Sequence, residues 1–123
     1  MQRIIGIGGV FFKAKDPERL YAWYEKHFGL TREPNGGGVM IHWPAPEQKG
    51  LTVFAIFPED TTYFNPGQSP FMLNFCVEDL DGLLAQLRQD AVAIDPKRKD
   101  YDYGRFAWIM DPEGNRIELW EPK

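Results

Sequence analysis

The stretch FAWIMDPEGNRIELWEP, residues 106–122, decides how the rest of the chain can be arranged. Its centre, DPEGN (111–115), is a dense turn signal, because proline presets φ for a turn and Gly-Asn tolerates positive φ. Apolar runs flank this turn on both sides, which predicts a β-hairpin. On the returning strand Glu118 lies between Ile117 and Leu119. Since side chains alternate along a strand, the carboxylate of Glu118 points either to solvent or into a site.

The composition of the chain indicates one domain with a sizeable core. Its 123 residues are 43% hydrophobic and 15% aromatic, and aromatic side chains also line ligand pockets. The net charge is −4, and no basic stripe is present apart from the short run 97–99 between acidic residues. Nucleic acid is therefore not an expected partner.

Cys76 is the only cysteine of the chain, which excludes an internal disulfide and fits a reducing compartment. It lies in an apolar run without a cationic neighbour, which favours a buried structural thiol over a nucleophile. The N-terminal residues lack the apolar segment of a signal peptide, and no run approaches the length of a membrane span. We therefore expect a soluble, cytoplasmic protein.

The two halves of the chain show the same order of elements: a strand, a capped helix and about three further strands. In the first half, strand 4–13 precedes a helix that Asp16-Pro17 opens and Gly29 ends. In the second half, strand 71–77 precedes a helix capped by Asp79. Apolar residues recur at helical spacing in both: Leu20, Trp23, Tyr24, His27 and Phe28, then Leu80, Leu83, Leu84 and Leu87.

This repetition predicts an α+β fold of two pseudo-repeated βαβββ modules. The modules, 1–58 and 71–123, are joined by linker 59–70 within one domain, 1–123. Their curled mixed sheets surround a shared cavity, with the helices on the outside. The remaining expected strands are 31–34, 38–43, 51–57, 91–94 and the two arms of the hairpin. Residues 95–104, which carry Tyr101 and Tyr103, are expected to be a loop, either a lid over the cavity or a plain surface loop.

Strand alternation selects the side chains that face the cavity. The expected set is Gly9, Phe11, Phe54, Met72, Asn74, Glu118 and Trp120. A few polar groups among apolar and aromatic ones are typical of a small-molecule site. The alternative is that these residues fill a dimer interface or a second small core. His42, between Ile41 and Trp43, is a further candidate for a ligand or acid/base role.

Three segments of the chain resemble the vicinal-oxygen-chelate superfamily, which includes glyoxalase I, extradiol dioxygenases, methylmalonyl-CoA epimerase and the bleomycin and fosfomycin resistance proteins. They are VFFKAKDPERLYAWYEKHFGL (10–30), LNFCVEDLDGLLAQL (73–87) and YGRFAWIMDPEGNRIELWEP (103–122). The family fold is a pair of βαβββ modules, and its members commonly form dimers. The resemblance therefore implies the duplicated fold described above and a homodimer.

Enzymes of this family bind a divalent metal through His, Glu or Gln at one place on each of four strands. The resemblance puts those places at Gly9, Phe54, Met72 and Glu118, so one carboxylate remains. Glycine and phenylalanine offer no ligand, and methionine is a soft ligand that does not suit Mg, Mn or Zn beside a carboxylate. No metal site and no cofactor are expected, although a divalent metal is not excluded.

The leading hypothesis is a bleomycin-resistance-like protein that binds a small, partly aromatic or cationic molecule without a catalytic metal. Glu118 is then a buried anion that partners a ligand cation, Arg105 or Arg116, and aromatic side chains stack on the ligand. The candidate binding residues are Phe11, His42, Phe54, Met72, Asn74, Tyr103, Arg105, Trp108, Glu118 and Trp120.

Two alternatives stay open. One is an enzyme: a metal-dependent lyase, isomerase or dioxygenase with an unusual ligand set, or a metal-free enzyme in which Glu118 is the catalytic base. The other is a non-catalytic interaction protein whose cavity is filled by side chains.

Overall fold

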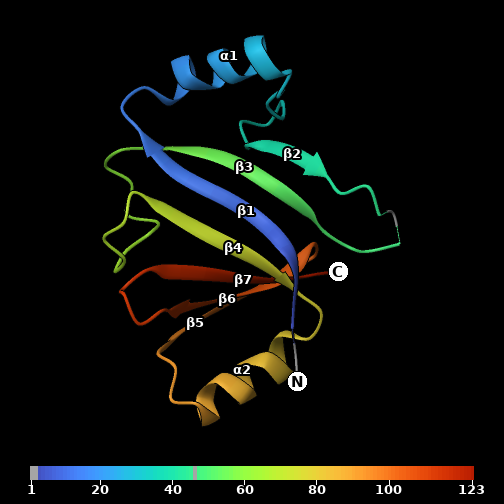
Figure 1. Cartoon of the computed structure of the whole chain (residues 1–123), viewed down its shortest axis with the longest axis vertical. Coiled ribbons are helices and arrows are strands. Elements are labelled where there is room, and N and C mark those ends of the chain that lie inside the picture. The colour runs from blue at the N-terminus through green and yellow to red at the C-terminus, as the bar shows by residue number, and fades with distance from the viewer. Residues whose placement is uncertain (1–2, 46) are drawn as a thin grey trace.

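The protein, seen here in a computed structural model that describes residues 3–45 and 47–123, is built on one mixed sheet of seven strands with two helices. The elements are β1 (Ile4–Ala14), α1 (Pro17–Phe28), β2 (Val39–His42), β3 (Leu51–Pro58), β4 (Phe71–Val77), α2 (Leu80–Gln89), β5 (Ile94–Tyr101), β6 (Gly104–Met110) and β7 (Arg116–Pro122). The sheet is not closed into a barrel. The two helices lie at opposite ends of the long axis of the molecule, α1 near β2 and β3 and α2 near β5 and β6 (Figure 1). The predicted α+β class is confirmed.

The strand order, β2-β3-β1-β4-β7-β6-β5, repeats one pattern on each side of the centre. β1 pairs with β3 in parallel, β4 pairs with β7 in parallel, and the two halves join through the antiparallel pair β1–β4. β4 and β7 therefore occupy in the second half the places that β1 and β3 occupy in the first. The division of the chain at linker 59–70 stays a prediction.

Both helices begin at the predicted caps. The side chains of Asp16 and Asp79 accept from the backbone N–H groups of Arg19 and Gly82, each at 3.1 Å. These bonds satisfy donors that the first helical turn leaves without partners. Gly29 ends α1 in the left-handed conformation, with φ of 69°. None of the described helices is long and apolar enough to cross a membrane.

The helices cover one side of the sheet, which we call the helix face. The predicted leucines of α2 pack there against Phe75, Ile109 and Leu119. The stripe expected on α1 is partly wrong, because Trp23 and Phe28 are 47% and 64% exposed. Tyr21, outside that stripe, is buried instead, and its hydroxyl accepts from the Ile56 N–H at 2.8 Å. Helix α1 thus sits on the sheet through a face rotated from the expected one.

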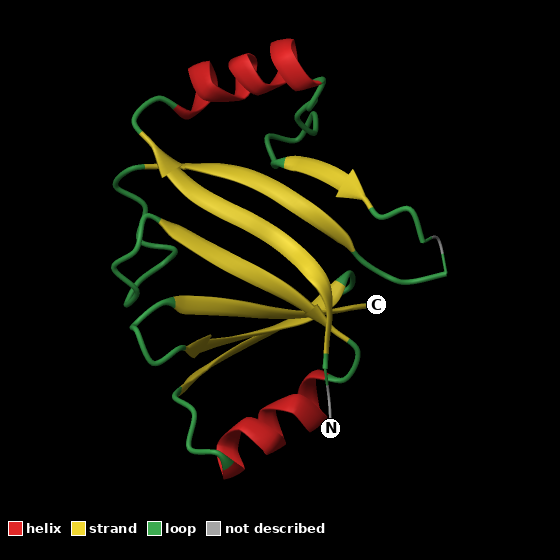
Figure 2. Cartoon of the chain, viewed as in Figure 1, coloured by secondary structure: helices red, strands yellow, loops and turns green. Residues whose placement is uncertain are grey.

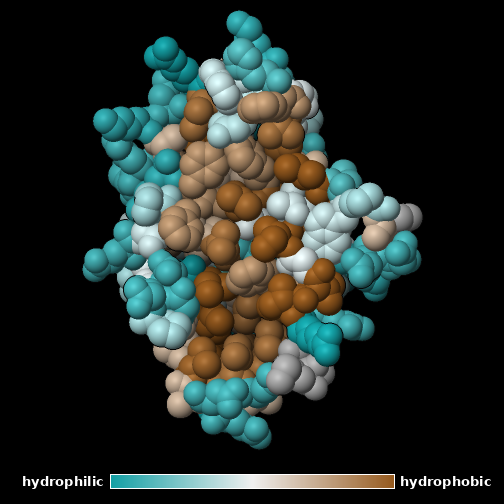
Figure 3. Space-filling view, in the orientation of Figure 1, coloured by the Kyte–Doolittle hydropathy of each residue, from teal (hydrophilic) through white to brown (hydrophobic). Residues whose placement is uncertain are grey.

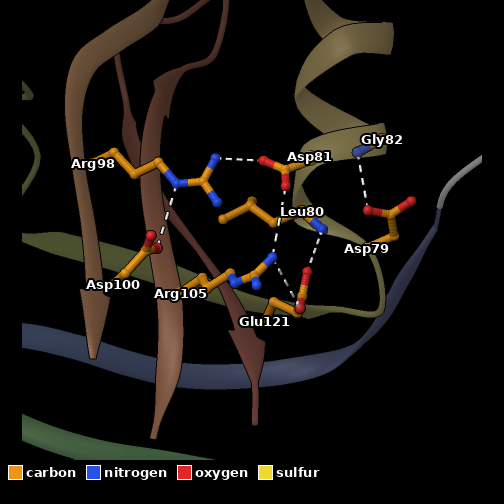
Figure 4. A network of polar contacts seen from close by, with 8 residues as sticks. All are labelled: Asp79, Leu80, Asp81, Gly82, Arg98, Asp100, Arg105 and Glu121. Atoms are coloured by element: carbon orange, nitrogen blue, oxygen red, sulfur yellow. Dashed lines mark hydrogen bonds and ion pairs between the residues drawn. The ribbon is translucent and has the colours of Figure 1, made fainter. Parts of the chain in front are cut away.

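The N-terminus of α2 is held against the second half of the sheet by a polar network (Figure 4). Glu121 on β7 accepts from the Leu80 N–H at 2.8 Å. Asp81 accepts from Arg98 on β5 at 2.5 Å and lies 3.6 Å from Arg105 on β6. The pKa of Asp81 is lowered, chiefly by the hydrogen bond from Arg98.

The expected strand 31–34 is not formed. Pro34 has no N–H for a ladder, and Arg32 turns back to α1, where its guanidinium binds Glu18 at 2.7 Å and lies 4.1 Å from the centre of the Tyr21 ring. The first half of the chain therefore contributes one strand fewer to the sheet than the second, and β2 is its edge.

The expected loop 95–104 is also wrong, because Ile94–Tyr101 form the edge strand β5. This strand pairs with β6 from Ile94↔Ile109 to Tyr101↔Gly104. Charged residues and a proline are typical of edge strands, since they discourage pairing with another chain. In the sequence, these charged residues and the proline led to the prediction of a solvated loop.

Candidate functional site

Glu118 on β7 lies on the other side of the sheet, which we call the inner face, and it is only 2% exposed. Its Oε1 accepts from Asn74 Nδ2 at 2.6 Å. Its Oε2 accepts from Trp108 Nε1 at 2.9 Å and from the Tyr63 hydroxyl. We call this group of four residues the Glu118 clamp. Both carboxylate oxygens are engaged, so the buried charge is stabilised by three donors.

Sheet register brings the clamp together. Asn74 on β4 and Trp108 on β6 are the direct partners of Glu118 on the neighbouring strands. Tyr63 comes from the loop between β3 and β4, which lies at the same end of the strands as the turn before β7 (Figure 2). Ser69 and Asn115 link that loop to the turn, with 2.5 Å between Oγ and Oδ1.

Tyr63 keeps its proton. Burial of the hydroxyl, then the charge of Glu118, raises the pKa of Tyr63 far above the ordinary 10.0. The hydroxyl therefore serves as a hydrogen-bond donor. The linker position of Tyr63 hid it from sequence reasoning, and the only available signal was an aromatic pair, Tyr63-Phe64, in an otherwise polar loop.

The centre of the inner face, where a shared cavity was expected, is filled by side chains. Phe11, Phe64, Met72 and Trp108 form a buried cluster there. A Cβ on Gly9 would lie 2.5 Å from the ring of Phe11. The space that Gly9 leaves open is thus occupied by an aromatic ring.

Phe54 does not lie at this site, which corrects the alternation predicted for β3. Its ring packs on the helix face, 4.9 Å from the ring of Tyr24 and 5.4 Å from that of Phe12. Val53 and Ala55 face inward in its place. Both sets of alternate residues in β3 are apolar, so the pattern could not distinguish the two faces.

Arg105 and His42 also lie apart from Glu118. Arg105 is on the helix face, 3.6 Å from Asp81 and 4.0 Å from Glu121, so it is not the predicted partner of Glu118. His42 is exposed at the end of the edge strand β2. Arg116 faces inward, but it binds Asp95 at 2.8 Å. The positive groups expected around Glu118 are therefore committed elsewhere.

A cavity of about 250 Å³ opens beside the clamp, over β5 and β6. We call it the outer pocket; its lining is Tyr63, Lys97, Lys99, Tyr101, Tyr103, Phe106 and Trp108. Tyr63 and Trp108 thus serve both the clamp and the pocket. The predicted candidate Tyr103 lines the pocket itself, and Trp120 lies near it, since its ring stacks on that of Phe106. Apart from Tyr103 and Trp108, the lining residues were not among the predicted binding residues: Tyr63, Lys97, Lys99, Tyr101 and Phe106.

The residues on the inner face do not fit the divalent metal of the resembled enzymes. Both oxygens of Glu118 already accept hydrogen bonds from protein donors, and the inward-facing Gly9, Ala55 and Met72 supply no hard ligand. Within residues 3–45 and 47–123, no three His, Cys, Asp or Glu side chains gather where they could share a metal.

Comparisons with known proteins agree on the fold. The sequence model of the Glyoxalase/Bleomycin resistance protein/Dioxygenase superfamily matches residues 6–119. None of the curated proteins matches the sequence significantly.

Several solved structures have the same architecture. A variant methylmalonyl-CoA epimerase of Streptomyces coelicolor, in complex with 2-nitronate-propionyl-CoA, has a TM-score of 0.68 and 16% identity, over 98% of this chain and 99% of that one. The methylmalonyl-CoA epimerase of Mycobacterium tuberculosis has a TM-score of 0.61 and 20% identity, over 98% of this chain and 89% of that one. An NAD-dependent benzaldehyde dehydrogenase from Legionella pneumophila has a TM-score of 0.61 and 17% identity, over 94% of this chain and 98% of that one. At these identities the likeness concerns the fold alone.

Proposed function

The chain belongs to the glyoxalase/bleomycin resistance protein/dioxygenase superfamily, and on that basis we propose that it binds a small organic molecule in the outer pocket. One observation carries the proposal: the residue at the family's last metal position, Glu118, is turned into a clamp that holds two walls of that pocket. The proposed binding needs no divalent metal.

The clamp favours a positioning role for Glu118 rather than direct contact with a ligand cation. Its oxygens already accept three hydrogen bonds, and its side chain is buried behind Tyr63 and Trp108. A ligand in the pocket would meet these rings, not the carboxylate. Because the Glu118 side chain is buried behind these rings, a ligand in the pocket would not touch it, and we propose binding without a reaction.

A thermal-shift panel of small anionic, neutral and cationic aromatic compounds tests the proposal. We expect at least one compound to raise the melting temperature, because a ligand that binds only the folded state stabilises it. The shift should weaken in Tyr103→Ala, whose ring lines the pocket and is 61% exposed. Phe28→Ala, at a 64% exposed ring on α1, is the matched control and should leave the shift unchanged.

A filled-cavity interaction protein is the second candidate, since aromatic side chains occupy the centre of the inner face. It predicts that no compound of the panel raises the melting temperature. The same result would contradict ligand binding.

A homodimer in the cytoplasm completes the proposal. Apolar side chains form a strip between the two helices on the helix face (Figure 3). Strand register and alternation place two apolar pairs on the helix face of the central strands β1 and β4: Ile7 with Phe75, and Val10 with Leu73. Ile7 is 40% exposed. An apolar strip of this kind suits contact with a second copy.

A further inference from the structure

The outer pocket combines flat aromatic walls with two lysines on one edge strand. Lys97, Lys99 and Tyr101 alternate along β5 and line the pocket together. Arg98, between the lysines, points the other way and binds Asp81 on α2. Strand β5 thus directs one set of its cations to the helix and the other set to the pocket.

The pocket lysines have no carboxylate partner among the described residues. The ion pairs of the described chain involve Arg32, Arg98, Arg105 and Arg116, and neither Lys97 nor Lys99. Lys97 Nζ lies instead 5.0 Å from the centre of the Trp108 ring. An ammonium group that lies over a ring and has no carboxylate partner can pair with the anionic group of a ligand.

Two carboxylates close to the pocket, those of Asp95 and Glu118, make their hydrogen bonds to other groups. Asp95 accepts from the Arg116 guanidinium at 2.8 Å, and its pKa is lowered chiefly by this bond. Glu118 accepts from three donors behind the pocket wall. Neither carboxylate therefore forms an ion pair with Lys97 or Lys99.

The rings of the pocket suit a flat partner. Tyr101 and Tyr103 stack with centroids 5.2 Å apart and an interplanar angle of 6°. Phe106 meets both rings edge-on, at 5.8 and 5.9 Å. Tyr101 and Tyr103 are 43% and 61% exposed, so large aromatic surfaces are open to a ligand at the mouth of the pocket.

We propose that the outer pocket takes a planar aromatic carboxylate of about one ring, a specific form of the proposed function on which it rests. Its volume of about 250 Å³ is below the roughly 300 Å³ at which pockets for drug-sized ligands begin. The carboxylate pairs with Lys97 and Lys99, and the ring lies against the tyrosines and Trp108. A carboxylate conjugated to a ring keeps its plane, whereas a tetrahedral phosphate does not.

Titration calorimetry with four matched one-ring compounds tests this ligand class. The probes are benzoate, benzamide, benzylamine and phenyl phosphate. We expect benzoate to bind about tenfold more tightly than benzamide, which has the same shape without the charge. Added salt should weaken benzoate binding, because the attraction to partly exposed lysines is screened.

Substitution of the lysines locates the charge. Lys97→Gln and Lys99→Gln should each weaken benzoate binding by about tenfold and leave benzamide binding unchanged. Both residues are exposed on an edge strand, so these variants should fold. Lys26→Gln, on the exposed end of α1, is the matched control and should not change the affinity for benzoate.

The outcomes separate this inference from the proposed function. Equal or tighter binding of benzamide, benzylamine or phenyl phosphate overturns the aromatic-carboxylate class, and so does benzoate binding that the lysine variants leave unchanged. If such binding still weakens in Tyr103→Ala, the proposed function survives. If no compound of either panel binds, both proposals fail.

Discussion

At the scale of single residues, the fold of this protein depends on a buried carboxylate that three donors satisfy. Glu118 accepts from Asn74, Trp108 and Tyr63. Loss of a buried acceptor costs more than the net value of its hydrogen bonds, because each donor keeps its desolvation penalty without a partner.

Glu118→Leu is expected to lower the free energy of unfolding by at least ~3 kcal/mol, since it leaves three donors unpaired. Glu118→Gln should cost ~1 kcal/mol or less. Its amide can still accept from Trp108 and Tyr63 and donate to the Asn74 Oδ1, which has no partner among the described residues, and it relieves the buried charge. Urea unfolding of both variants provides the measurement. Equal costs for Leu and Gln would contradict the clamp.

Cys76 gives a second prediction at this scale. Burial raises the pKa of its thiol from 9.0 to about 12. In the unfolded chain the thiol ionises with the ordinary pKa of 9.0. The free energy of unfolding therefore keeps this contribution below about pH 9 and decreases as the pH rises toward 12. Cys76→Ala should therefore lose less stability than the wild type between those pH values, measured by urea unfolding. An identical alkaline loss would show that Cys76 is not the group responsible.

Residue-level prediction from the sequence succeeded where polarity interrupts an apolar pattern. Asn74 and Glu118 stand out among apolar neighbours, and both lie on the inner face. Phe54 was assigned to the wrong face, because β3 is apolar on both sides. Tyr63 was missed, since its contact with Glu118 depends on how a loop folds over the sheet.

At the scale of elements, the two helices end differently. Helix α1 ends at Gly29, for which a φ of 69° carries no steric cost. After α2, Ala91 has a φ of 60°. The Ala91 and Val92 N–H groups bond to the Arg88 and Leu87 carbonyls at 3.1 and 3.0 Å, which is the Schellman pattern. Ala91 thus adopts the left-handed conformation, which glycine adopts at a lower steric cost than alanine.

Ala91→Gly should therefore raise the free energy of unfolding by about 1 kcal/mol. The matched control is Ala85→Gly, at an exposed position inside α2. It should lower stability by about the same amount, because glycine is a poor helix former. Thermal unfolding of the two variants gives the comparison, and a destabilised Ala91→Gly protein would refute this account of the helix end.

The sequence predicted elements well where caps and periodicity coincide, as at Asp16 and Asp79. It failed at the edges of the sheet. Strand β5 has the charges and proline of a loop, and only its pairing with β6 makes it a strand. Segment 31–34 was expected to be a strand because a glycine run, 36–38, follows it and could form a turn to the next strand. The contacts of Arg32 with α1 hold the segment out of the sheet.

At the scale of the whole molecule, the apolar strip between the helices predicts self-association. We expect light scattering after size-exclusion chromatography to give the mass of a dimer. Ile7→Lys, at a 40% exposed position in the strip, should give monomers, because it buries a charge in an apolar contact. Met40→Lys, at a 43% exposed position on β2, should remain dimeric. A monomeric wild type, or a dimeric Ile7→Lys variant, would exclude this surface as the interface.

The overall architecture was the most predictable property of the chain, since both halves carry the same caps and strands. The state of its centre was not predictable, because the sequence does not reveal that Phe11 occupies the space beside Gly9. We propose that Glu118 clamps a ligand pocket and does not hold a metal.

The metal content per chain distinguishes these two roles of Glu118. The protein should be purified without chelators and measured by inductively coupled plasma mass spectrometry, beside Glu118→Gln. We predict substoichiometric Mn, Fe, Co, Ni and Zn in both proteins. One equivalent of any of these metals in the wild type, lost in Glu118→Gln, would show that Glu118 holds a metal.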